Sequence, residues 1–134
     1  MSGLLLDTHA IIWIAEGIPI APKAKREIDQ ALHPGRVFVS AISAWEMAQL
    51  AVRRRIALTM VDGWLDRLLA RTGFSALPLT PECAVKAALL PAIHRDPADR
   101  FLIATAQVND LVLITRDTAM LAYAEAGHCR AIVC

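Results

Sequence analysis

The stretch Leu111-Val-Leu-Ile-Thr115 is apolar throughout, up to its final threonine, and it is rich in β-branched residues. It therefore predicts a strand that is buried on both faces. Two earlier stretches are also short and mainly apolar, and the second of them is β-branched: Gly3-Leu-Leu-Leu6 and Arg36-Val-Phe-Val-Ser40. Strands without apolar–polar alternation are typical of parallel sheets covered by helices on both sides. These three stretches thus indicate the central layer of an α/β protein.

Helical segments alternate with these strands, and Pro, Gly, Ser, Thr or Asp marks most of their ends. Alternation of this kind predicts parallel strands joined by crossover helices, in one domain spanning residues 1–134. We expect a mostly parallel sheet of four to five strands in an α/β/α sandwich. The helices are predicted over residues 10–15, 23–32, 43–55, 61–71, 80–90, 96–109 and 118–126, and further strands over 74–79 and 130–134.

Composition excludes some classes of protein but does not name a function. Of the 134 residues, 56% are hydrophobic, yet charged residues interrupt every candidate stretch, so no membrane segment is expected. The first residues lack the basic start of a secretion signal. The cysteines, Cys83, Cys129 and Cys134, have no C-x-x-C spacing, and this favours free thiols in a reducing cytoplasm. With a net charge of only +1, no overall basic field points to nucleic acid.

Four acidic residues stand where the predicted strands end or the following helices begin. Asp7 follows the first strand directly, and Asp117 lies just past the stretch quoted above. Glu46 comes shortly after the second strand, and Asp99 lies at the start of the helix that leads into the strand Leu111–Thr115. Ligands of such sheets bind beyond the carboxyl ends of the strands, so these side chains can meet at one edge. Gathered carboxylates are hard oxygen ligands for Mg²⁺ or Mn²⁺.

Helix capping offers a second explanation for the acids. Asp7 and Asp117 could each cap the helix that follows, and Glu46 stands three residues after Ser43, as in a capping box. Asp96 would cap the helix that begins at the following proline. It is therefore expected to be a cap, or to contact the metal ligands, rather than to bind the metal itself. Position alone leaves capping and metal binding open.

Helical spacing helps to distinguish metal binding from helix capping for two of the acids. Asp99 shares its helix face with Leu102 and Ile103, so it is predicted to point toward the core. A carboxylate in that position needs a partner, which a metal ion would supply. Glu46 shares its helix face with Gln49, and a solvent-exposed helix face without a function would show the same pattern.

Four segments together resemble the PIN domains, and most closely the VapC-type toxins of prokaryotic toxin–antitoxin pairs. The resemblance runs in order over nearly the whole chain, although Ala98 replaces the bulkier residue expected before the third acid. The segments are Leu4-Leu-Leu-Asp-Thr-His-Ala10, Ser40-Ala-Ile-Ser-Ala-Trp-Glu46, His94-Arg-Asp-Pro-Ala-Asp-Arg100 with Phe101-Leu-Ile-Ala-Thr-Ala106, and Leu113-Ile-Thr-Arg-Asp117.

This resemblance implies a PIN-like three-layer sandwich and an activity. The matching residues, Asp7, Glu46, Asp99 and Asp117, would form the catalytic cluster of a Mg²⁺-dependent endoribonuclease, with Mn²⁺ able to substitute. Asp7, Asp99 and Asp117 would bind the metal. The resemblance further implies a cytoplasmic homodimer that cleaves RNA as a type II toxin and is inhibited by a cognate antitoxin protein.

Several neighbours of the acids are candidates for supporting roles. Thr115 is expected to orient a metal-bound water or a carboxylate, although a helix-start hydroxyl would look the same. Arg100 and Arg116 adjoin catalytic positions and are candidate phosphate ligands. The run Arg53-Arg-Arg55 would suit RNA binding, but three basic residues at a helix end also complement the helix dipole.

Other residues suggest different chemistry only weakly. His9 and His94 lie beside acids, but they lack the spacing of a zinc site. Trp13, Trp45 and Trp64 are expected in the core or at an interface rather than as base-stacking platforms.

Two alternatives compete with the nuclease. One is a phosphohydrolase in which Asp7 is a covalent nucleophile. Such sites typically have a second acid two residues on and a nearby lysine, whereas His9 stands there and no lysine is near. The other is a non-catalytic RNA- or protein-binding PIN-like module whose acids are only caps.

Overall fold

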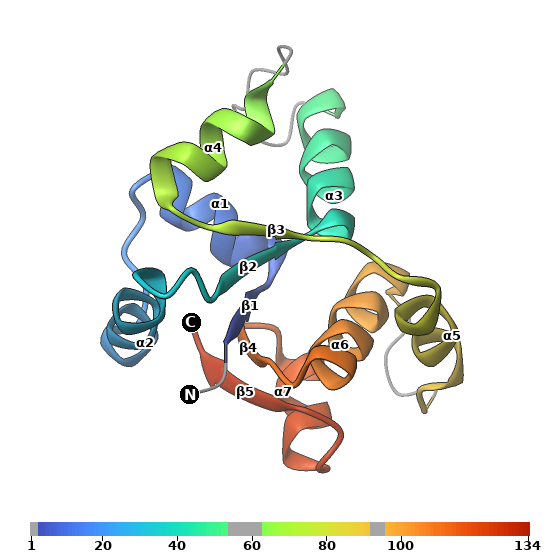
Figure 1. The fold of residues 1–134 in the computed structure, drawn as a ribbon. Helices are drawn as coiled ribbons and strands as arrows, with labels where there is room; N and C mark the ends of the chain where they lie inside the picture. Colours follow the sequence, from blue (N-terminus) through green and yellow to red (C-terminus); the bar gives the residue numbers. More distant parts are fainter. Residues whose placement is uncertain (1–2, 54–62, 92–95) are drawn as a thin grey trace.

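The computed structural model describes residues 3–53, 63–91 and 96–134. Their centre is a five-stranded sheet with the strand order β3-β2-β1-β4-β5, in which every neighbouring pair is parallel (Figure 1). This confirms the predicted parallel sheet. The strands are β1 Leu4–Leu6, β2 Val37–Ser40, β3 Ser75–Leu77, β4 Val112–Thr115 and β5 Arg130–Val133.

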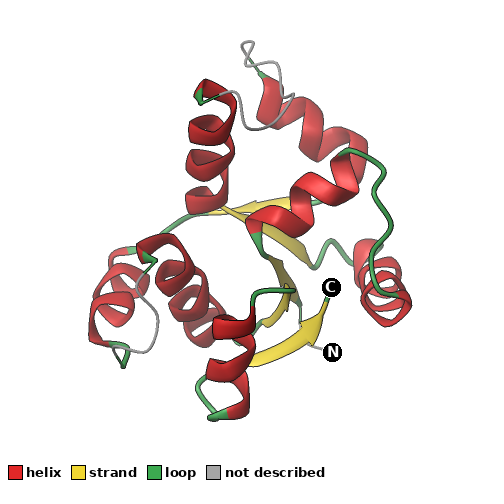
Figure 2. Cartoon of the chain, turned by 180° about the vertical axis from the view of Figure 1, so that it is seen from behind, coloured by secondary structure: helices red, strands yellow, loops and turns green. Residues whose placement is uncertain are grey.

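Helices cover both faces of this sheet (Figures 1 and 2). Leu4 and Leu6 of β1 pack into a core formed with α1, α2 and α4 on one face. Leu5 points the other way, into a core formed with α5, α6 and α7. The arrangement is the expected three-layer sandwich. The helices are α1 Thr8–Ala15, α2 Pro22–Leu32, α3 Ala41–Val52, α4 Trp64–Thr72, α5 Pro81–Leu89, α6 Pro97–Asn109 and α7 Thr118–Glu125.

Strand β1 is the middle of the sheet, between β2 and β4. Leu4 pairs with Val37 on one side and with Val112 on the other. Because the strands are parallel, the residues that follow β1, β2 and β4 all emerge at the same edge. Asp7 emerges there directly after β1, and Asp117 emerges shortly after β4.

The start of α3 differs from the sequence prediction. The helix begins at Ala41, and the Oγ of Ser40 caps it by accepting a hydrogen bond from the backbone N–H of Ile42 at 3.1 Å. The predicted capping box between Ser43 and Glu46 is therefore wrong, because both residues lie inside the helix. The predicted cap of α6 is confirmed, since Asp96 accepts from the backbone N–H of Ala98.

The other helix boundaries agree closely with those predicted from the sequence. Gly73 ends α4 with a φ of 80°, a conformation that costs glycine little. The predicted ends of two helices, at residues 54–55 and 61–62, lie outside the described residues. All three cysteines are free thiols, as predicted. Within the described segments, no helix has the length and apolar character needed to cross a bilayer.

Candidate active site

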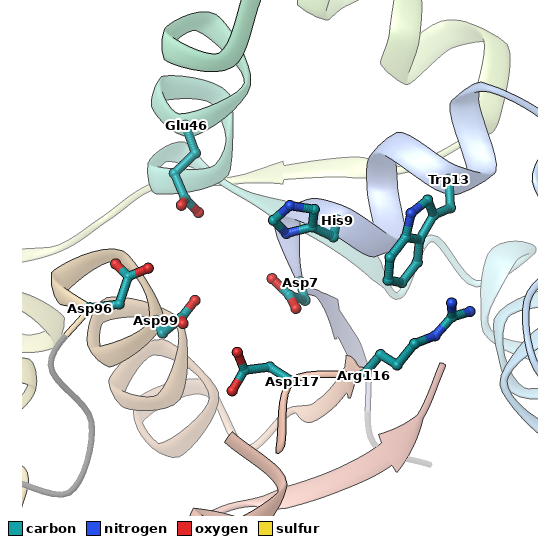
Figure 3. Close-up of a pocket in the computed structure, with 8 residues that line it drawn as sticks. All are labelled: Asp7, His9, Trp13, Glu46, Asp96, Asp99, Arg116 and Asp117. Atoms are coloured by element: carbon teal, nitrogen blue, oxygen red, sulfur yellow. The ribbon is translucent and has the colours of Figure 1, made fainter. Parts of the chain in front are cut away.

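A pocket of about 290 Å³ opens at the carboxyl edge of the central strands. Figure 3 shows carboxylates from separate elements turned toward one another inside it. All four predicted catalytic acids line this pocket, which confirms that they converge. The lining residues are Asp7, His9, Trp13, Glu46, Asp96, Asp99, Arg116 and Asp117.

Asp7 stands at the N-cap position of α1, but its side chain makes no capping hydrogen bond. Instead its Oδ2 accepts a hydrogen bond from the Oγ1 of Thr115 at 2.8 Å, across the β1–β4 pair. Only 6% of Asp7 is exposed, and this burial raises the pKa of its carboxyl, while the bond from Thr115 opposes the rise. The capping explanation therefore does not account for this side chain.

Thr115, at the end of β4, connects two of the acids. Its buried hydroxyl donates to Asp7 and accepts from the backbone N–H of Asp117 at 3.0 Å. Asp117 also caps α7, because its Oδ1 accepts from the backbone N–H of Met120 at 2.9 Å. For Asp117, capping and a place in the pocket are thus compatible. One hydroxyl fixes the relative positions of both acids.

Glu46 extends from α3 on the opposite side of the pocket (Figure 3). Its Oε1 accepts a hydrogen bond of 2.5 Å from the Oγ1 of Thr8, and that hydroxyl also lies 2.9 Å from the Oγ of Ser43. Burial raises the pKa of Glu46, the bond from Thr8 opposes this, and the charges of Asp96 and Asp7 raise it further. A buried hydroxyl pair thus anchors the half-buried carboxylate.

Asp99, in the first turn of α6, is only 9% exposed, as its helical spacing predicted. Its pKa is raised to about 8, first by burial and then by the negative charges of Asp96, Asp7, Asp117 and Glu46. The acids are therefore close enough to repel one another. Such a site is unfavourable when all of its members are ionised without a counter-charge.

The two predicted arginines differ in position. Arg116 lines the pocket, and its guanidinium lies 4.0 Å from the centre of the Trp13 ring, a cation–π contact. Its Nε donates to the backbone oxygen of Cys134 at 3.0 Å. These two contacts hold Arg116 on the side of the pocket away from Glu46 (Figure 3).

Arg100, in contrast, is not among the residues that line the pocket. Its guanidinium donates to the backbone oxygens of Ala87, Leu90 and Pro91, at 3.2, 2.6 and 2.9 Å. Those oxygens lie at the C-terminal end of α5, where a cation also complements the helix dipole. Arg100 therefore joins the end of α5 to the start of α6, a supporting position rather than one in the lining of the pocket.

Comparison with known proteins identifies the family. The sequence profile of the PIN domain matches residues 4–126. The chain belongs to the PIN domain family. It is 37% identical over 120 residues to Ribonuclease VapC22 of Mycobacterium tuberculosis, covering 87% of this chain and 88% of that protein.

Solved structures share the PIN fold. VapBC2 from Rickettsia felis, crystallised with a DNA fragment from its promoter, matches with a TM-score of 0.71 at 13% identity, over 97% of both chains. A toxin–antitoxin complex from Klebsiella pneumoniae matches with a TM-score of 0.64 at 21% identity, over 97% of this chain and 96% of that one.

The donor set of this PIN domain fits a hard divalent cation. Five carboxylates line the pocket, and oxygen ligands of this kind suit Mg²⁺ or Mn²⁺. Within the described segments, no three His, Cys, Asp or Glu side chains already form a group ready to enclose an ion. The fit therefore rests on the chemistry of the donors and on the repulsion that a cation would relieve. His9 lies at the rim, and His94 lies outside the described residues.

Sequence reasoning missed Thr8 in this PIN domain. Its position directly after Asp7 suggested only a helix start, but its side chain is buried and points to Glu46. A hydroxyl beside an acid at a strand end is the only available signal. It does not tell which distant carboxylate the hydroxyl meets, because that depends on how α1 packs against α3.

Proposed function

We propose that this protein is a Mg²⁺-dependent endoribonuclease and the toxin of a type II toxin–antitoxin pair. The observation that carries the proposal is the convergence of four buried or half-buried acids in one pocket at the carboxyl edge of the sheet. Membership of the PIN family and the relative named Ribonuclease VapC22 support the activity.

We propose a role for each acid from its surroundings. Asp7, Asp99 and Asp117 lie near one another in the pocket and would hold the cation (Figure 3). When bound, the ion would supply Lewis-acid stabilisation of the phosphodiester and lower the pKa of water. Glu46, held by Thr8, would accept a proton from the attacking water, since a carboxylate with a raised pKa is a better base near neutral pH.

Arg116 supplies the positive charge that phosphate needs. The contacts with Trp13 and Cys134 fix its guanidinium at the pocket edge, opposite Glu46. A planar guanidinium can donate two parallel hydrogen bonds to a phosphate. We propose that it binds a phosphate of the RNA backbone next to the one that is cleaved.

The phosphohydrolase alternative fits the pocket less well. None of the described residues that line it is a lysine, and Oδ2 of Asp7 already accepts a hydrogen bond from Thr115. Attempted trapping of a phosphoaspartate, followed by mass spectrometry, separates the two reactions. A covalent adduct at Asp7 would favour the phosphohydrolase.

We further propose that the protein is a cytoplasmic homodimer that binds an antitoxin. Val85 and Leu89 lie one turn apart on α5 and are 60% and 78% exposed, and Val52 of α3 is also exposed. Apolar side chains that stand out in this way suit a subunit contact. We propose that a basic side chain of the antitoxin enters the carboxylate pocket and competes with the metal.

The test is cleavage of single-stranded RNA by purified variants in Mg²⁺ or Mn²⁺. We expect Asp7→Asn and Asp99→Asn to lower kcat/KM by about 100-fold or more, because metal-ion stabilisation is worth several kcal/mol. The matched control is Glu125→Gln, an exposed acid at the far end of α7, which should leave the rate unchanged. Near-wild-type rates in both pocket variants would show that the acids are structural.

Isothermal titration with Mn²⁺ addresses the non-catalytic alternative directly. Acids that act only as helix caps have no reason to bind the ion stoichiometrically. We expect saturable Mn²⁺ binding by the wild-type protein and weaker binding by Asp99→Asn. Absence of binding would favour the non-catalytic module.

A further inference from the structure

A second groove, of about 260 Å³, adjoins the catalytic pocket. The two share Glu46 and Asp96, so these acids stand between them as a common wall. One side of the groove is α3, and Pro97 and Ala98 contribute from the start of α6. A chain that passes over the acids from the catalytic pocket therefore enters this groove next. Its lining residues are Trp45, Glu46, Gln49, Leu50, Arg53, Asp96, Pro97 and Ala98.

Trp45 is placed differently from the other tryptophans. Trp13 and Trp64 are partly buried and pack against the core, whereas Trp45 is 53% exposed. From the sequence, all three are expected in the core or at an interface, and this exposure excludes a core position for Trp45. An exposed indole beside a catalytic acid offers a flat apolar surface of the kind on which nucleobases stack.

Polar groups continue from Trp45 along α3. Trp45, Gln49 and Arg53 are spaced four residues apart, so they share one helix face over about 12 Å. The amide of Gln49 can donate to or accept from a base edge or a ribose. Arg53 brings a positive charge to the groove, whereas Arg116 lines the catalytic pocket that adjoins it. An aromatic ring alternating with donors is typical of a single-strand binding surface.

This lining distinguishes the groove from an apolar hollow elsewhere on the protein. That hollow, between the end of α1 and the start of α2, is formed mainly by Ile14, Ile18, Ile20 and Ile28. It has the character of a site for apolar side chains. The groove along α3 has charged and amide groups around a single aromatic ring and is continuous with the catalytic pocket, which favours the substrate over a protein partner as its occupant.

We propose that a single-stranded RNA segment runs from Arg116 across the acids into the groove along α3. There one base stacks on Trp45, and a backbone phosphate contacts Arg53. The proposal rests on the ribonuclease function proposed above and specifies its substrate as unpaired RNA. A base in a duplex is stacked on its neighbours and cannot stack on a side chain as well.

The main experiment separates binding from chemistry. The substrate is a pool of randomised RNA 12-mers, single-stranded or annealed to their complements, cleaved in Mn²⁺. We expect Trp45→Ala to raise KM by about 5- to 150-fold with little change in kcat, the range that corresponds to loss of one base–aromatic stack. Trp45→Phe should recover much of the loss, and Arg53→Ala should raise KM and flatten its salt dependence. The duplex should resist cleavage.

Val133→Ala is the matched control, because Val133 of β5 is an exposed apolar residue that does not line the groove. Its KM should equal that of the wild type. Light scattering on each variant tests the competing occupant. If Trp45→Ala changes the oligomeric state and leaves the KM of RNA unchanged, the groove binds a second copy of the chain and the proposal is overturned.

Failure of this proposal is distinguishable from failure of the function. If the wild type cleaves RNA and Trp45→Ala has the same KM, the path of the strand is wrong and the nuclease stands. Fluorescence anisotropy of a labelled RNA 12-mer, bound to the Asp99→Asn variant with and without Trp45→Ala, gives a second readout that needs no cleavage. Equal affinities of the two proteins would overturn the stacking contact even if no cleavage were found.

Discussion

Asp99→Asn should stabilise the metal-free protein, and the gain should grow with pH. The pKa of Asp99 is raised from 3.8 to about 8, first by burial and then by the neighbouring carboxylates. The folded protein therefore holds this proton more tightly than the unfolded chain does. Its contribution to stability is complete below about pH 4 and is lost as pH rises toward 8. Asparagine has nearly the same shape and stays neutral throughout.

The size of the effect follows from this difference in proton affinity. Stability falls by about 1.4 kcal/mol for each pH unit above 3.8, which sets an upper limit of about 4 kcal/mol at pH 7. The pocket opens to solvent, and water screens part of the repulsion. We therefore expect a gain of about 2 kcal/mol at pH 7, or about 5–10 °C in Tm for a domain of this size.

Melting curves in EDTA at pH 4, 5.5, 7 and 8 provide the assay. The Tm difference between Asp99→Asn and wild type should be near zero at pH 4 and largest at pH 8, and Glu125→Gln should show no such trend. Saturating Mn²⁺ should reverse the order, because a ligand at 100 times its Kd adds about 2.7 kcal/mol to a protein that binds it. If Asp99 mainly complements the dipole of α6, the variant will instead melt lower at neutral pH, and the repulsion argument is refuted.

Three further predictions concern residues around the acids. Thr115→Val should cost about 1–3 kcal/mol and lower the rate of RNA cleavage, whereas Thr115→Ser should retain both; thermal melts and cleavage assays on the pair decide this. Arg100→Ala should lower the free energy of unfolding by about 2–3 kcal/mol in urea titrations but leave the KM for RNA unchanged, since its guanidinium binds backbone oxygens of α5; a raised KM would restore its role in substrate binding. Val85→Asp with Leu89→Asp should convert a dimer into a monomer in light scattering, and a wild-type monomer at micromolar concentration would count against the dimer.

Much of the fold could be predicted from the sequence because strands and helix ends are marked by neighbouring residues in the chain. Continuous apolar stretches predicted the buried parallel strands, and Thr80, Asp96 and Gly73 marked helix ends that the structure confirms. The convergence of the acids was also predictable, since a parallel sheet brings its carboxyl ends to one edge. Their catalytic roles remain predictions that the assays above address.

The features that sequence did not reveal depend on packing between distant elements. Ser40 and Ser43 are equally good caps by type, and the point where β2 ends selects Ser40. Arg100 and Arg116 each adjoin an acid, yet the first faces the end of α5 and the second faces the pocket. Thr8 acquires its role only when α1 packs against α3. None of these choices has a local signature.

The hydrogen bond from Thr115 to Asp7 joins residues that are 108 positions apart in the chain. Strand β1 precedes β4, one of its two sheet neighbours, by about a hundred residues, so β1 is synthesised well before β4. Until β4 docks, Asp7 lacks its orienting hydroxyl, and Asp117 is absent from the pocket. The acids are therefore assembled only by late, long-range strand pairing, a slow kind of folding event. A nascent chain that ends before residue 112 lacks Thr115 and Asp117, so under the proposed mechanism it cannot yet cut RNA.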